Sequence, residues 1–302
     1  MEKSAPRPFR ERSGMARELT PRERIERSII KTYRKTLWNP FIAAVKRYEL
    51  IAPGDRIAVC ISGGKDSMLL ALLMRLLARV SDCPFSLEYL VMDPGYAPEN
   101  RRRIEENAAL LELPIRVFES DIFAVTDRVT DNPCYLCARM RRGFLYSHAR
   151  EIGCNKIALG HHMSDVIETT LMGMMYGAQL QGMLPRLRSR NFPGMELIRP
   201  LYCILEDDIL AWQRHNDLRF IACACRMTER IAAAGGGDTH PSKRQETKEL
   251  IRALRRINPQ IDGNLFRSIH NVGLDTFVGY KTGGVSHSFL ERLRDGSADD
   301  EE

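Results

Sequence analysis

The chain has 302 residues, of which 44% are hydrophobic and 28% charged, so its composition is that of a folded globular protein and not of a disordered one. Its 45 basic and 39 acidic residues give a net charge of +6, and residues 299–302 concentrate acid at the end of the chain. The body is therefore more basic than the total, which suits a polyanionic partner such as RNA. Apolar runs are too short to span a membrane and no secretory segment is recognisable, so we expect a cytoplasmic protein.

The first segments of the chain differ in pattern. Residues 1–27 are rich in Arg, Glu and Pro with little apolar periodicity, which predicts a mobile arm of mixed charge. Residues 28–53 carry apolar side chains at roughly helical spacing, with a break or kink expected at Pro40. We therefore expect a helical segment ahead of the core.

From residue 54 onward, short apolar strands alternate with amphipathic helices. Strands are predicted at 56–61, 87–92, 115–118 and 156–159, and helices at 66–79, 100–111, 139–152 and 165–176. This alternation predicts an α/β fold over residues 54–226, a doubly wound parallel sheet with helices on both faces. Ligands of such sheets bind at the carboxyl ends of the strands.

The end of the chain has a weaker pattern. Residues 227–302 are predicted to form a C-terminal helical extension with an acidic tail. Within it, residues 232–237 are expected to be a small-residue loop and residues 243–257 a basic helix.

One segment, Ser62-Gly63-Gly64-Lys65-Asp66-Ser67, lies between a predicted strand and a predicted helix. Glycines let the backbone approach an anion, the first amides of a helix point at it, and a lysine adds positive charge. A Walker-type loop is excluded, because Val59 stands where its first glycine belongs and Asp66 follows the lysine in place of Ser or Thr. The segment therefore predicts a phosphate-binding loop of another kind.

Eight cysteines in a chain without an export signal are expected to stay reduced. Cys134 and Cys137 are separated by two residues, so both thiolates can reach the same side of a turn and hold one metal centre. This pair alone does not choose between zinc, a redox dithiol and an iron–sulfur cluster. No second such pair exists, so a four-cysteine zinc ribbon is excluded, and Cys223 or Cys225 remains to complete the site. The other four are expected to act as small hydrophobic residues: Cys60, Cys83, Cys154 and Cys203.

The loop at 62–67 resembles the PP-loop of the ATP pyrophosphatase superfamily, which has the fold called adenine nucleotide alpha-hydrolase-like. Four later segments, in order, are similar to the tRNA 2-thiocytidine synthetase family: residues 134–143, 156–162, 182–189 and 198–203. The resemblance implies an ATP-dependent tRNA-cytidine 2-sulfurtransferase. Such an enzyme adenylates the C2 carbonyl of a cytidine, at tRNA position 32, and replaces the oxygen with sulfur, releasing AMP and pyrophosphate.

The same resemblance implies ATP, Mg²⁺ and a [4Fe-4S] cluster as cofactors. The loop residues Ser62, Gly63, Gly64 and Ser67 would hold the nucleotide together with two catalytic residues, Lys65 at the pyrophosphate and Asp66 at Mg²⁺. Asp93, Gly160, His161 and Asp165 would bind the nucleotide at the ends of later strands. Cys134, Cys137 and Cys223 would hold the cluster and leave one iron open for sulfide, with Cys225 as the alternative third ligand. The chain departs from the family at Ser164, which stands beside Asp165 where the family has paired aspartates.

The implied partners are tRNA and a sulfur donor such as a cysteine desulfurase, with no membrane. A homodimer is one oligomeric state that the sequence leaves open. Two groups of arginines are expected to contact RNA phosphates: Arg139, Arg141, Arg142 and Arg150 in the first, and Arg186, Arg188 and Arg190 in the second.

Rival interpretations come from two classes. One is a related PP-loop enzyme that thiolates another base or makes lysidine; lysidine chemistry needs no cysteine pair, and the uridine enzymes carry extra zinc-finger cysteines that this chain lacks. The other is a non-catalytic iron–sulfur sensor that binds RNA, against which the intact nucleotide loop argues.

Overall fold

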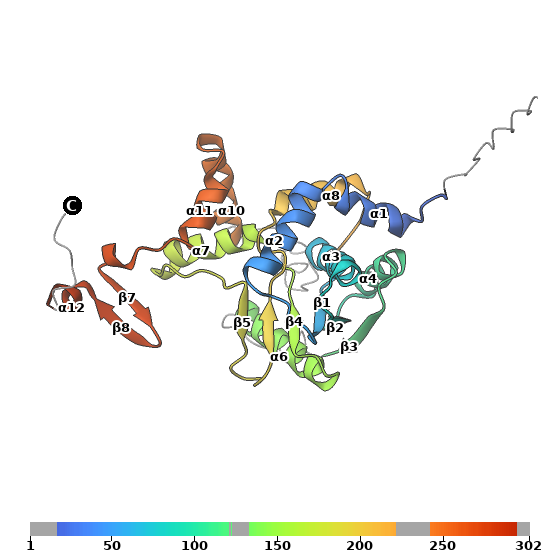
Figure 1. The fold of residues 1–302 in the computed structure, drawn as a ribbon, viewed down its shortest axis with the longest axis horizontal. Helices are drawn as coiled ribbons and strands as arrows, with labels where there is room; N and C mark the ends of the chain where they lie inside the picture. The colour runs from blue at the N-terminus through green and yellow to red at the C-terminus, as the bar shows by residue number, and fades with distance from the viewer. Residues whose placement is uncertain (1–16, 121, 123–132, 222–241, 295–302) are drawn as a thin grey trace, which may run out of the picture.

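A computed structural model describes residues 17–120, 122, 133–221 and 242–294 (Figure 1). Its main sheet has six strands in the order β3-β2-β1-β4-β6-β5. Their bounds are Arg56–Ile61 (β1), Ser86–Asp93 (β2), Ile115–Glu119 (β3), Lys156–Ala158 (β4), Arg186–Arg188 (β5) and Glu196–Ile198 (β6). All neighbouring pairs are parallel except β5 with β6, which is antiparallel. The predicted α/β fold is confirmed, with one antiparallel edge strand in addition.

Helices cover both faces of the sheet, and the alternation along β1 shows how. Ile57 and Val59 pack into a core with α3 (Lys65–Val80), α4 (Pro98–Leu110) and α8 (Glu206–His215). Ala58 and Cys60, between them in sequence, face a second core with α6 (Pro133–Glu151). Because successive strand residues point to opposite faces, one apolar strand serves two layers of helices.

The N-terminal helices pack on the first of these layers. They are α1 (Pro21–Ile30), a π-helix at Arg34–Trp38 and α2 (Asn39–Arg47), with Pro40 in the first turn of α2.

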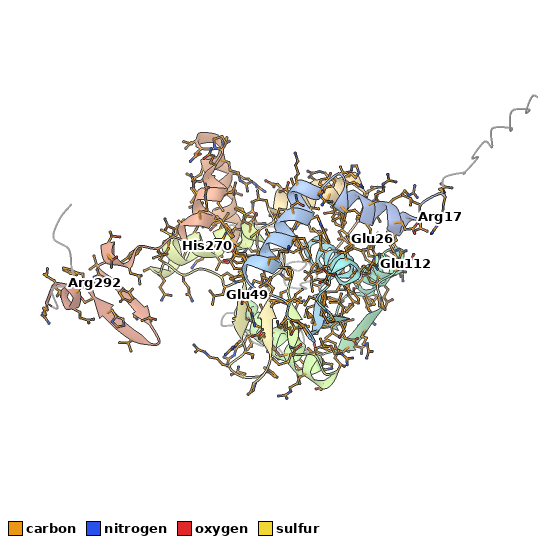
Figure 2. The ribbon with its side chains drawn as sticks, in the orientation of Figure 1. Arg17, Glu26, Glu49, Glu112, His270 and Arg292 are labelled. Atoms are coloured by element: carbon orange, nitrogen blue, oxygen red, sulfur yellow. The ribbon has the colours of Figure 1, made fainter. Side chains whose placement is uncertain are left out.

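The expectation of a mobile arm is wrong for residues 21–27, which form α1. Thr20 and Glu23 make a capping box at its start. Glu26, labelled in Figure 2, is buried and pairs with Arg75 and Arg79. Most residues of α1 are charged or polar, as in a disordered tail, and only a few of its side chains are buried. Composition alone therefore predicted an arm and not a helix. Residues 1–16 of the predicted arm lie outside the described residues.

The C-terminal region contains the predicted basic helix, α10 (Lys243–Ile257), followed by α11 (Ile261–Ser268). Both pack against α7 (Met163–Gly177), where Ile251 and Phe266 are buried with Val166 and Ile167. A short 3-10 helix (Leu274–Thr276), the hairpin β7 (Gly279–Thr282) and β8 (Val285–Ser288), and α12 (Phe289–Arg294) stand away from the body (Figure 1). The predicted loop at 232–237 and most of the tail lie outside the described residues. No helix in the described ranges is long and apolar enough to cross a membrane.

Candidate nucleotide-binding site

The loop of residues 62–64 connects β1 directly to α3. Gly63 has a φ of +83°, and a Cβ there would lie 2.5 Å from Cγ1 of Ile104, so the position requires glycine. Gly64 is the N-cap of α3 and offers no side chain to its first amides, which leaves them available for an anion. Ser67 Oγ accepts from the amide of Ser62 (3.1 Å) and donates to the carbonyl of Gly64 (3.0 Å). The loop is thus held in shape by its own residues.

A cleft of about 610 Å³ opens beside this loop, at the carboxyl ends of β1 and β4. β1 and β4 are parallel neighbours, and the strand order reverses between them: β2 and β3 lie on one side of β1, and β4 and the later strands lie on the other. Such folds bind ligands at this place. The residues that line it include six of the predicted nucleotide contacts: Ser62, Asp66, Ser67, Gly160, His161 and Asp165. Gly160 approaches the loop so closely that a Cβ would lie 3.1 Å from the amide nitrogen of Ser67. Two strands therefore deliver the predicted residues to one cavity.

Asp93 is the last residue of β2 and does not line this cleft. Its Oδ1 accepts from the amides of Gly95 (2.8 Å) and Tyr96 (2.7 Å), and its Oδ2 accepts from Arg101 (2.7 Å). Burial opposes ionisation, but these donors together hold the pKa of Asp93 below its usual value. Its neighbour Met92, not Asp93, lines the cleft. The carboxylate therefore shapes the turn in this structure.

Lys65 begins α3 and is paired on two sides. Its Nζ lies 3.2 Å from Oδ2 of Asp66 and 2.9 Å from Oε1 of Glu206, at the start of α8. The other oxygen of Glu206 accepts from Lys248 of α10 at 2.8 Å. Burial disfavours the charged form of Glu206, but the two lysines outweigh it and lower its pKa to about 2. Glu206 is therefore a carboxylate shared by two cations.

Helix α10 also supplies Arg244 to the cleft, a residue that sequence reasoning missed. Its Nη1 lies 3.1 Å from Oδ1 of Asp165, and its Nε lies 3.4 Å from Oε2 of Glu168. Lys248 is 3.7 Å from the other oxygen of Glu168. Burial raises the pKa of Glu168 in spite of both cations. The C-terminal helix is thus joined to the cleft by a network of alternating charges.

The two histidines that follow β4 have different surroundings. His162 is the N-cap of α7: its Nδ1 accepts from the amide of Asp165 (3.3 Å), while Asp165 Oδ2 accepts from the amide of His162 (3.0 Å). This bond places any single ring proton on Nε2, which lies 3.7 Å from Oδ1 of Asp66. His161 faces the cleft, and burial, with help from Arg199, lowers its pKa to about 4. It is therefore a neutral ring at neutral pH.

Arginines make the far wall of the cleft basic. Arg141 and Arg142 of α6 line it, as does Arg199, which follows β6 and was not predicted. Burial and the nearby Arg142 lower the pKa of Arg199 to about 10, so it stays charged at neutral pH. The other predicted RNA contacts do not line the cleft: Arg139, Arg150, Arg186, Arg188 and Arg190. Among them, Arg186 and Arg188 both pair with Glu196, at 2.9 Å and 3.7 Å, and the Arg188 side chain is 90% exposed.

The cysteines divide into two groups. Cys60 and Cys154 are buried in the core beneath α6, where burial raises the pKa of both thiols, and Cys83 and Cys203 are partly buried. Cys134 and Cys137 lie in the first turn of α6. This helix begins six residues before the predicted start, so the pair belongs to a helix and not to a turn. Cys223 and Cys225, the two candidates for a third ligand, lie outside the described residues.

The fold and the loop define a PP-loop protein. The family model described as a PP-loop domain matches residues 25–230. A tRNA-cytidine(32) 2-sulfurtransferase of Alkalilimnicola ehrlichii is 36% identical over 250 residues, covering 80% of this chain and 75% of the relative. One from Geobacter metallireducens is 34% identical over 250 residues, covering 80% and 91%. The chain belongs to the tRNA-cytidine(32) 2-sulfurtransferase family, which confirms the resemblance found in its motifs.

A solved structure has the same fold. The U34-tRNA thiolase NcsA from Methanococcus maripaludis, with its [4Fe-4S] cluster, aligns with a TM-score of 0.60 over 80% of each chain. Its sequence identity is 19%, so the likeness concerns the fold alone.

Proposed function

We propose that this chain is an ATP-dependent tRNA thiolation enzyme that adenylates the C2 carbonyl of cytidine 32 and replaces its oxygen with sulfur. The observation that carries the proposal is the cleft, in which the PP-loop, His161 and Asp165 meet the arginines of α6. Membership in a family of enzymes named tRNA-cytidine(32) 2-sulfurtransferase supplies the base and its position.

The loop is suited to hold the phosphates of ATP. The free amides at the start of α3 would stabilise the pyrophosphate as it leaves, because the helix orients them before the reaction, and the ammonium of Lys65, the first residue of α3, would add positive charge. Asp66 lines the same cleft and has an oxygen, Oδ1, without a hydrogen-bond partner among the described residues, which fits a role in holding Mg²⁺. Gly160, His161 and Asp165 would contact the rest of the nucleotide.

The reaction follows from what ATP can do to a pyrimidine carbonyl. The C2 oxygen attacks the α-phosphorus, the bond from that phosphorus to the bridging oxygen breaks, and pyrophosphate leaves. The adenylated oxygen is then a good leaving group, so sulfide adds to C2 and AMP departs with the former carbonyl oxygen. Neutral His161 and charged Arg199 beside the loop would orient the α-phosphate and the base during this exchange.

The cysteine pair fits an iron–sulfur site beside the cleft. Cys134 and Cys137 precede Arg141 and Arg142 on the same helix, and these arginines line the cleft. The amide of Ile221 donates to the carbonyl of Gly63 at 3.3 Å, so the described chain reaches the loop two residues before Cys223 in sequence. These three cysteines would hold a [4Fe-4S] cluster, with Cys225 as the alternative third ligand. When bound, such a cluster supplies an iron that can carry the transferred sulfur.

The remaining expectations stay predictions. tRNA is the proposed macromolecular substrate, with a cysteine desulfurase as an example of the sulfur donor. A homodimer and a cytoplasmic location are further predictions, as is the division of the chain after residue 53 into segments 54–226 and 227–302. The cysteine pair disfavours a lysidine synthetase, and the intact loop disfavours a non-catalytic sensor.

The nucleotide assignment is tested with Lys65→Ala. We expect AMP formation from ATP and tRNA to be lost, while the cluster absorbance near ~400 nm is kept, because the lysine serves the phosphates and not the iron. Lys46→Ala, an exposed lysine of α2, is the control and should keep both. Normal AMP formation by Lys65→Ala would show the assignment to be wrong.

The cluster assignment is tested separately, with anaerobically reconstituted protein. Cys134→Ala and Cys137→Ala should each lose the absorbance and tRNA thiolation, whereas buried Cys60→Ala should keep both at a modest cost in stability. Comparing Cys223→Ala with Cys225→Ala identifies the third ligand. Wild-type protein that binds zinc and no iron would contradict the cluster assignment and leave the nucleotide assignment standing.

A further inference from the structure

Lys65, the lysine of the phosphate loop, is already paired with a carboxylate that a bound phosphate would have to compete with. Lys65 lies 2.9 Å from Glu206, whose side chain is only 22% exposed. A phosphate that binds Lys65 competes with this carboxylate for the ammonium. If Glu206 were left without a partner, the loss of its ion pair would cost free energy, and phosphate binding would be weaker by that amount.

Glu206 has a second partner that removes this difficulty. Lys248 of α10 lies 2.8 Å from Oε2 of Glu206, whereas Lys65 contacts Oε1. The two lysines thus use different oxygens, so Lys65 can leave while the carboxylate keeps a cation. Of the described residues, these are the cations within 4.0 Å of Glu206.

Lys248 is held firmly in this place. Ser242 caps the start of α10, Thr247 and Ile251 are buried on one face of the helix, and Tyr176 of α7 donates to Glu246 at 2.6 Å. Glu168, which also lies 3.7 Å from Lys248, keeps Arg244 as a partner of its own. Helix α10 lies beyond the residues matched by the PP-loop family model, which end at 230.

We propose that Lys248 is a positioning residue for nucleotide binding, which holds Glu206 so that Lys65 can exchange this carboxylate for a phosphate of ATP. The C-terminal extension is then part of the nucleotide site through a residue that need not touch the nucleotide. The inference rests on the proposed role of Lys65 in binding phosphate.

The test measures the dissociation constant of the full chain for α,β-methylene-ATP, which cannot be cleaved at the reacting bond, by titration calorimetry. Lys248→Met should weaken binding roughly five- to tenfold, because Lys65 becomes the last partner of Glu206. Lys248→Arg should restore it. Lys243→Met removes the same charge from the same helix, where Lys243 contacts the ring of Tyr176 and not Glu206, and should change binding by less than about twofold.

A double-variant comparison separates positioning from direct phosphate contact. In a Glu206→Gln background the competitor is gone, so adding Lys248→Met should have no further effect on the dissociation constant. An equal loss in both backgrounds would overturn the proposal, and so would unchanged binding by Lys248→Met. Melting temperatures of all variants report whether the fold is kept.

Lys65→Met separates a failure of the proposed role of Lys65 from a failure of the role inferred for Lys248. If it binds the analogue as tightly as wild type, the proposed role of Lys65 is wrong and the inference falls with it. If Lys65→Met binds weakly and Lys248→Met binds normally, only the inference is overturned.

Discussion

At the scale of single residues, Gly63 is required for two reasons, its backbone conformation and the lack of room for a side chain, and their costs can be measured separately. Its φ lies in the left-handed region, and a Cβ built there would lie within 2.9 Å of side-chain atoms of Ile104 of α4 and Ile221. Gly54 has nearly the same φ, +82°, but nothing lies within 4 Å of a Cβ built there. The pair therefore distinguishes the cost of backbone strain from the cost of a steric clash.

We predict that Gly54→Ala lowers the free energy of unfolding by about 1 kcal/mol, the cost of the left-handed backbone alone. Gly63→Ala should lower it by about 3 kcal/mol or more, because its Cβ would also displace the fully buried Ile104. Urea denaturation of both variants measures the difference. Equal losses would mean that α4 moves aside at little cost.

The neutral state of His161 gives a prediction about pH. Its pKa is about 4 in the folded protein and near 6.5 in an unfolded chain, so unfolding takes up a proton between these values. The contribution to stability is complete above about pH 6.5 and is lost as the pH falls toward 4, by about 2 kcal/mol at about pH 5. The difference in unfolding free energy between wild type and His161→Gln should show this pH dependence. A difference that is flat from pH 7 to pH 5 would contradict it.

The candidate site was predictable where its chemistry is contiguous in sequence. Ser62, Asp66 and Ser67 belong to one short loop, so their spacing alone indicated a phosphate site. Arg199 and Arg244 come from segments far from the loop in sequence, and they line the cleft only because of how β6 and α10 pack. A signal for Arg199 was present, since it belongs to the Arg-Pro-Leu run after Ile198; none pointed to Arg244.

At the scale of elements, length decided what the sequence could predict. The strands and helices between residues 56 and 119 were predicted within two residues of their observed ends, because each is long enough to show its period. The strands β5 and β6 have three residues each, too few to show alternation. Helix α8 was missed although it has acidic residues in its first turn and Arg214 and His215 in its last, a pattern that complements the helix dipole.

Helix α1 gives a prediction at this scale, because one carboxylate fastens it to α3. Glu26→Ala should lower the free energy of unfolding by about 2–4 kcal/mol, since it leaves the buried guanidinium of Arg75 without its partner at 2.6 Å. The control is Glu105→Ala on α4, which removes a pair whose glutamate is 51% exposed and should cost less than about 1 kcal/mol. Chemical denaturation measures both. A similar loss in the two variants would mean that α1 is held by its apolar contacts alone.

At the scale of the whole molecule, contacts cross the boundaries of the predicted segments. Tyr48, just after α2, hydrogen-bonds His270, just after α11, at 2.9 Å between Oη and Nε2. His270 is labelled in Figure 2 where the chain leaves α11 for the outlying hairpin. Tyr202 packs edge-on against Tyr48 and lies beside Phe266, so an N-terminal helix and a C-terminal helix share one aromatic cluster. Helices before and after the sheet thereby pack together around α7.

The order of the strands also has a consequence for the folding pathway. Ile57 of β1 pairs with Leu87 on one side, a short closure, but with Lys156 on the other, roughly one hundred residues away. Loop-closure entropy therefore favours β1, β2 and β3 assembling first, and the union with β4 should be the late step. Pulse-labelling hydrogen exchange should show β2 amides protected before those of β4. Because the cleft lies at this junction, the nucleotide site would come into existence only at that last step, so ATP should slow unfolding without accelerating the first stage of folding.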